Sequence, residues 1–284
     1  MINKSVIISL LLAVTVTLPV AAQQDEQRFQ GFNLQGYNDS GEKAWDVVGE
    51  TADVVDGTKI QLTNINANTY GERSLNVTAA EGLVDQTSGF MKLEKDVVIT
   101  SDDGSQMMTD YVEWNREEDL VQSDDEVFIK NDNFTATGTG LEARPGMKSA
   151  QLKKDVTVRV DTSQLAPESS AEPVEPPKQF LTVTSDGPMV LDQLLNKARF
   201  EVNVVAEQED QTLKADVIEI YFKEGMRDII EMVCIGNVEI TQGDNKTYAE
   251  KATYNAEDQK LTLSGRPKLI LETGGENGIA PLGN

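Results

Sequence analysis

The chain has 284 residues, a formal net charge of −23, one cysteine and no histidine. The negative charge excludes a surface built for nucleic acid phosphates, because such binding depends on neutralisation by Lys and Arg. One cysteine excludes an intrachain disulfide and a Cys-rich zinc site, and we interpret Cys234 as a small buried side chain. An aromatic content of 6% is low for a large globular core and favours an elongated, thin-cored shape.

The first predicted element is a secretory signal over residues 1–22. An apolar run over 6–18 follows Lys4 and precedes the small-residue sequence PVAA, after which we expect cleavage. The run is shorter than the roughly 20 residues that span a bilayer as a helix. We therefore expect a protein exported to the periplasm, with anchoring in the inner membrane as the alternative if the signal is retained.

Beyond the signal, the periodicity is that of short β-strands. Apolar residues alternate in pairs such as Val97 and Ile99, or Val127 and Ile129, and turn sequences such as Asp102–Gly104 separate the runs. Residues 162–178, TSQLAPESSAEPVEPPK, break this pattern and predict a Pro/Ser/Glu-rich linker between two β domains, with a flexible tail over 273–284. Side-by-side and end-to-end arrangements of the two domains both stay open.

An internal repeat relates the two domains. Each of the segments LEKDVVIT, DDEVFIK, LKKDVTVRV, FEVNVVAEQ and CIGNVEITQG contains a valine that opens an alternating strand. Asp or Asn precedes this valine in all but the second segment, which has Glu126. A second element, a small residue and an acid before an alternating strand, recurs in MMTDYVEWN, TLKADVIEIYF and TYAEKATYN. An internal repeat of this kind predicts stacked units that share one continuous core. We expect a long sheet that folds back over itself to form this core.

On these segments the sequence resembles the periplasmic lipopolysaccharide export proteins of the LptC and LptA (OstA-like) type. Residues 28–161 are similar to LptC through FNLQGYNDSGEKAWDVVGETADV and FTATGTGLEA, and residues 179–272 to LptA through VTSDGPMVLD and YAEKATYNAEDQKLTLSGRPKLI. The resemblance implies an all-β fold of two bent antiparallel jelly-roll-like troughs. It also implies that the troughs hold acyl chains and join neighbouring bridge proteins by strand-edge pairing.

The function that follows is a bridge component of lipopolysaccharide transport to the outer membrane. Its expected partners are lipopolysaccharide or a similar acylated glycolipid, other export-bridge proteins and an inner-membrane transporter complex that supplies energy, and not nucleic acid. The alternative is a non-enzymatic β-structured envelope or surface scaffold that has a closed core and binds protein or carbohydrate on its outer faces.

The candidate lipid-binding residues are the apolar positions of the alternating strands. For each of them ordinary core packing is the competing interpretation, because alternation looks the same against a sheet or a lipid. They are Val97, Ile99, Val112, Trp114, Val127, Ile129, Val156, Val158, Val204, Leu213, Ile220, Phe222, Val238, Ile240 and Tyr254.

Neither a metal site nor an active site is predicted. Acid clusters such as Asp124–Glu126 lack the spacing of calcium-binding loops, so solvated turns are the expected role. With no histidine, no nucleophile elbow and no phosphate-binding loop, the sequence predicts a protein that is not an enzyme and needs no cofactor.

Overall fold

The computed structural model describes residues 28–271 except residues 39, 56, 71–73, 116, 162–179 and 225–227. The expected signal, linker and tail lie outside the described residues. The described chain is almost entirely strand, and the all-β fold predicted from the sequence is confirmed. None of the described residues forms a helix long and apolar enough to cross a membrane.

Over the residues that the structure describes, seventeen strands follow one another, with a single 3-10 turn, η1 (Pro145–Met147), between β8 and β9. The strands of the first trough are β1 (Arg28–Tyr37), β2 (Lys43–Val55), β3 (Lys59–Thr69), β4 (Leu75–Asp85), β5 (Phe90–Ser101), β6 (Gln106–Asn115), β7 (Leu120–Lys130), β8 (Phe134–Arg144) and β9 (Ser149–Asp161). Those of the second are β10 (Phe180–Ser185), β11 (Met189–Asp192), β12 (Lys197–Gln208), β13 (Gln211–Phe222), β14 (Ile229–Gln242), β15 (Asn245–Asn255), β16 (Lys260–Ser264) and β17 (Lys268–Ile270).

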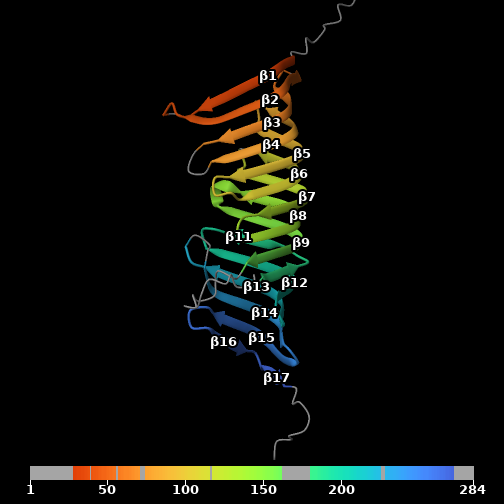
Figure 1. Cartoon of the computed structure of the whole chain (residues 1–284), viewed down its shortest axis with the longest axis vertical. Coiled ribbons are helices and arrows are strands. Elements are labelled where there is room, and N and C mark those ends of the chain that lie inside the picture. Colours follow the sequence, from red (N-terminus) through yellow and green to blue (C-terminus); the bar gives the residue numbers. More distant parts are fainter. Residues whose placement is uncertain are drawn as a thin grey trace, which may run out of the picture.

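The strands form one antiparallel sheet. They lie one after another along the long axis of the molecule, with β1 at one end and β17 at the other (Figure 1). Most strands pair with the next strand in the sequence. Two strands are broken: β10 and β11 lie end to end between β9 and β12, and β16 and β17 lie end to end along β15. Each broken strand therefore occupies one position in the sheet.

The two predicted domains are joined in this sheet without a gap. Strand β9 pairs with β10 from Val156 to Asp161 and with β11 from Ser149 to Leu152. Asp161 and Phe180, which flank the expected linker, are register partners. The guanidinium of Arg159 also lies 3.8 Å from the centre of the Phe180 ring. The two troughs therefore lie end to end within one chain, an arrangement that the sequence left open.

The repeated valines mark the fold of the sheet. Asp96, Asp155, Asn203 and Asn237 all have φ between 45° and 54°, and the pairing register shifts beside each of them. Asn and Asp adopt this left-handed conformation more readily than other non-glycine residues. The strand bends there, and the valine that follows each bend is at most 1% exposed, as Val127 is after Glu126.

Acids on neighbouring strands contact the bends in both troughs. Asn237 donates hydrogen bonds of 2.9 and 3.1 Å to the two carboxylate oxygens of Asp216. Gly236 makes room for this contact, since a Cβ there would lie 2.2 Å from an Asp216 oxygen. Lys95 contacts Glu81 at 2.6 Å in the corresponding place of the first trough. These contacts link neighbouring strands beside a bend in each trough.

Candidate functional site: the inner face of the trough

The bends divide the sheet into two walls whose inner faces carry the apolar side chains. We call the wall that contains the end of β9 wall A and the wall that contains the start of β9 wall B. Because register partners in adjacent strands lie on the same face of a sheet, the pairing itself traces rows of side chains along each wall.

Row A crosses the whole molecule from β1 to β17. Each member is the register partner of the next, and all are apolar except one threonine. The row consists of Leu34, Val47, Ala67, Val77, Ile99, Met107, Ile129, Ala136, Val158, Val183, Ala206, Leu213, Ile240, Thr247 and Leu269.

Row B runs along the other wall from β2 to β16. It is also an unbroken succession of register partners, and tyrosine is its most polar member. The row consists of Val54, Ile60, Val84, Met91, Trp114, Val121, Ala143, Ala150, Leu191, Ala198, Ile220, Met232, Tyr254 and Leu261.

Burial changes in a regular way across the trough. The valines at the bends are fully covered, and most residues of rows A and B are half-buried. Between β10 and β13 most members of the two rows are buried, with Val183 at 3% and Ile220 at 6% exposure, while Leu191 and Leu213 are half-buried. At the two ends they open to solvent, where Leu34 is 43% and Leu269 is 61% exposed. The inner face therefore combines fully buried positions at the bends with half-buried apolar positions along both walls.

The fifteen residues singled out in the sequence fall into distinct places on this inner face. Row A holds Ile99, Ile129, Val158, Leu213 and Ile240, and row B holds Trp114, Ile220 and Tyr254. Val97, Val127, Val156, Val204 and Val238 lie at the bends. Val112 is buried in the core of the first trough, and Phe222 packs at the edge of the core of the second. Their role in lipid binding stays a prediction.

The apolar residues at the open end beside β1 are not among the lipid-binding residues predicted from the sequence. Leu34 and Val47 belong to row A, and the Trp45 ring lies over Gly36, where a Cβ would come within 2.3 Å of it. Trp45 is 38% exposed. The alternation of Phe32, Leu34 and Gly36 with polar residues was the available signal, but the glycine and the flanking amides weakened it.

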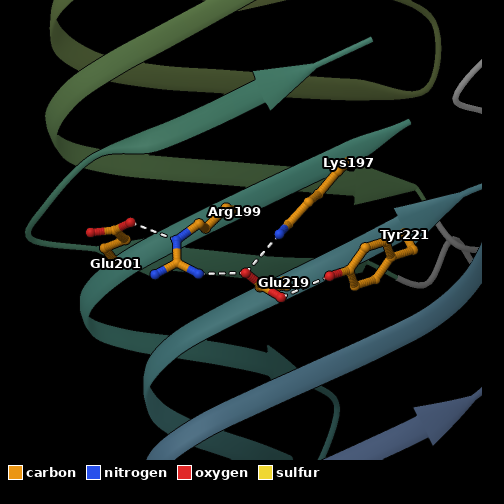
Figure 2. A network of polar contacts seen from close by, with 5 residues as sticks. All are labelled: Lys197, Arg199, Glu201, Glu219 and Tyr221. Carbon is orange, nitrogen blue, oxygen red and sulfur yellow. Dashed lines mark hydrogen bonds and ion pairs between the residues drawn. The ribbon is translucent and has the colours of Figure 1, made fainter. Parts of the chain in front are cut away.

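A charged network supports wall B from the outer face. Glu219 lies on β13 between Ile218 and Ile220, is 8% exposed, and contacts Lys197 at 2.7 Å (Figure 2). Tyr221 donates a 2.8 Å hydrogen bond to it, and Arg199 contacts both Glu219 and Glu201. The contacts link β12 to β13 behind Ala198 and Ile220, where row B is covered.

The ionisation of Glu219 follows from these contacts. Burial is the largest single influence and tends to raise the pKa of the carboxyl group. The hydrogen bonds from Lys197, Tyr221 and Arg199 together outweigh burial and lower the pKa to about 2. The contact with Glu219 in turn raises the pKa of Lys197. Glu219 is therefore a structural anion at neutral pH, and its two cations are held in fixed positions.

Cys234 is the one cysteine of the chain and lies in the core. Burial alone raises the pKa of the Cys234 thiol to about 12, so it is protonated and unreactive at neutral pH. Over the part of the chain that the structure describes, no three His, Cys, Asp or Glu side chains are grouped so as to hold a metal ion.

The two unbroken rows define a class of protein built as a long antiparallel β trough with an apolar inner face. The chain belongs to the family described as lipopolysaccharide-assembly, LptC-related, which its residues 6–161 match. Residues 182–279 match a second family, the LptA/LptD N-terminal domain of lipopolysaccharide transport proteins. The chain is thus a fusion of an LptC-like and an LptA-like domain.

Among solved structures, the chain is similar to LptH from Pseudomonas aeruginosa, described as the LptA-homologous periplasmic component of the conserved lipopolysaccharide transport device. The identity is 12%, the match covers 70% of this chain and 95% of LptH, and the TM-score is 0.18. A comparison with curated proteins gave no match.

Proposed function

We propose that the protein is a periplasmic bridge component of lipopolysaccharide transport, and that it carries the acyl chains of its cargo along rows A and B. The observation that supports this role is the continuity of both rows across the junction of β9 with β10 and β11. A ligand in the groove meets an apolar side chain at every strand of either wall there. Its sugars and phosphates stay outside the groove.

The energetics favour an acyl ligand in spite of the chain's charge. Each buried methylene contributes about 0.8 kcal/mol, and several acyl chains carry many methylenes. Repulsion between the phosphates of the ligand and the acidic exterior is screened over roughly 8–10 Å in physiological salt. We infer that apolar contact holds the ligand and that the negative surface keeps its headgroup from settling.

In this proposal the free edges of the sheet join the protein to its neighbours. Strand β1 has a described partner only in β2, and β16 and β17 have one only in β15. Exposed edges of this kind accept a strand from another protein. Directional movement would depend on an inner-membrane transporter complex, because the sequence has no nucleotide-binding motif.

Native mass spectrometry of the chain without residues 1–22 tests the proposal most directly. We expect it to retain purified lipopolysaccharide and to lose a deacylated control. Retention of both forms equally, or of neither, would favour the scaffold alternative, in which the groove is closed.

A crosslinking experiment locates the ligand. A photoreactive residue at Ile240, in row A, should crosslink to lipopolysaccharide, whereas the same residue at neighbouring Glu239 should not, because alternate residues face opposite sides of a strand. Replacing Ile240 with Asp should abolish crosslinking from a photoreactive residue at Leu213, its register partner. Equal crosslinking at positions 239 and 240 would contradict binding on the inner face.

A further inference from the structure

The sheet edge at the C-terminal end differs in charge from the rest of the molecule. Residues 260–271, KLTLSGRPKLIL, contain three cations and no acid in a chain whose net charge is −23. Leu261, Leu269 and Leu271 on this segment are 47%, 61% and 59% exposed. An edge with unpaired backbone groups and exposed apolar side chains is a template for strand pairing.

Lysine and proline on an edge strand can also serve to prevent pairing. The structure of β10–β11 argues against that role for Pro267. Both broken strands consist of two short segments separated by three residues that end in proline, Asp186–Pro188 in one and Gly265–Pro267 in the other. Strand β10–β11 is nevertheless paired on both sides, by β9 and β12. A break that ends in proline therefore does not prevent β16–β17 from pairing with a second strand on its free side.

Strand direction limits what that neighbour can be. Strands β1, β9, β12 and β16–β17 all run from wall B to wall A, whereas β10–β11 runs from wall A to wall B. A second copy stacked head to tail would bring its β1 parallel to β16–β17, although all described pairs are antiparallel. An antiparallel neighbour must run from wall A to wall B.

A second copy turned about a two-fold axis would run in the required direction. It would also bring the edge cations Lys260, Arg266 and Lys268 of the two copies close together, which costs free energy. Every described strand that runs in the required direction, β10–β11 included, is already paired on both sides. Neither arrangement of two copies combines antiparallel pairing with complementary charge.

We propose that the β16–β17 edge binds an acidic strand of the β10–β11 type from a different protein. This inference rests on the strand-edge joining proposed above and adds the chemistry and direction of the partner strand. Residues 180–192, FLTVTSDGPMVLD, show the required features: two apolar segments, two aspartates and no Lys or Arg. With the two bends aligned, the acidic bend of such a strand faces Arg266 and its flanking segments pair with β16 and β17.

A synthetic fluorescent peptide with the sequence of residues 180–192 tests the proposal by anisotropy against the chain without residues 1–22. We expect saturable binding that weakens about tenfold or more when Lys260, Arg266 and Lys268 are all changed to Glu. The matched control changes the exposed Lys130, Lys154 and Lys214 to Glu and should bind as the unmodified chain does. A peptide with Asp186→Lys and Asp192→Lys should prefer the variant with the acidic edge.

Four results would overturn the proposal. They are no peptide binding, equal loss of binding in both triple variants, self-association of the chain that the edge variant abolishes, and edge-dependent binding to phosphatidylglycerol vesicles without peptide binding. Uptake of a fluorescent fatty acid by the groove is measured on the same samples. Failure of peptide binding with fatty acid uptake intact refutes this inference alone, whereas the reverse result refutes the transport proposal.

Discussion

Replacing Glu219 with Gln should remove a pH-dependent part of the stability of the second trough. The carboxyl group has a pKa of about 2 in the folded protein, against an ordinary value of 4.5. A difference of this size corresponds to on the order of 3 kcal/mol of stability, at about 1.4 kcal/mol for each pKa unit. Because Glu219 is only 8% exposed, solvent screening reduces this figure little.

The direction of the pH effect follows from the lowered pKa. The stabilisation is fully present above about pH 4.5 and is lost as the pH falls through about 2, because protons then bind the unfolded chain first. The Gln variant keeps the shape of the side chain but leaves Lys197 without its 2.7 Å anionic partner. The variant should therefore be less stable than the unmodified protein at pH 7, and the gap should shrink below pH 4.5.

Urea unfolding followed by circular dichroism at pH 7, 5, 4 and 3 measures this gap for each protein. Glu201→Gln serves as the control, since it removes a charge from the exposed end of the same network, where the side chain is 37% exposed. We expect the control to show a small gap that varies little with pH. A gap for Glu219→Gln that is constant from pH 7 to pH 3 would refute the reasoning.

Three further predictions concern packing and backbone. Gly236→Ala should destabilise the protein by about 1–3 kcal/mol in a thermal melt, because φ is 77° and the new Cβ would meet Asp216. The control Gly243→Ala has open space around the new Cβ and should cost only about 1 kcal/mol in the same melt. Phe200→Ala should cost about 3–5 kcal/mol in the same melt, since the ring is 3% exposed in the core beneath the covered part of the groove. Val183→Pro should disrupt the junction between the troughs, because it removes a ladder hydrogen bond from a strand that is paired on both sides. Amide hydrogen exchange should then rise first in β9–β12, and unchanged exchange there would contradict the pairing.

The predicted strands and the repeat were readable because they depend on local chemistry. Alternation with a period of two marks one apolar face, and the recurring Asx–Val pair marks bends because Asn and Asp tolerate positive φ. The bend at Asn64–Ile65 was missed, although Asn64 has φ 49° and Ile65 is 4% exposed, because isoleucine replaces the valine there. The sequence pattern could not separate buried bend positions from half-buried wall positions.

Composition, periodicity and the repeat determined that the chain is an all-β protein built from two related units with apolar inner faces. Only the tertiary structure decided that the units share one sheet, because strand pairing between β9 and β10–β11 is a contact between backbones and leaves no side-chain signature. The same holds for the two continuous rows and for the directions of the free edges. They follow from the register of every pair of neighbouring strands, which is fixed only when the whole sheet has formed.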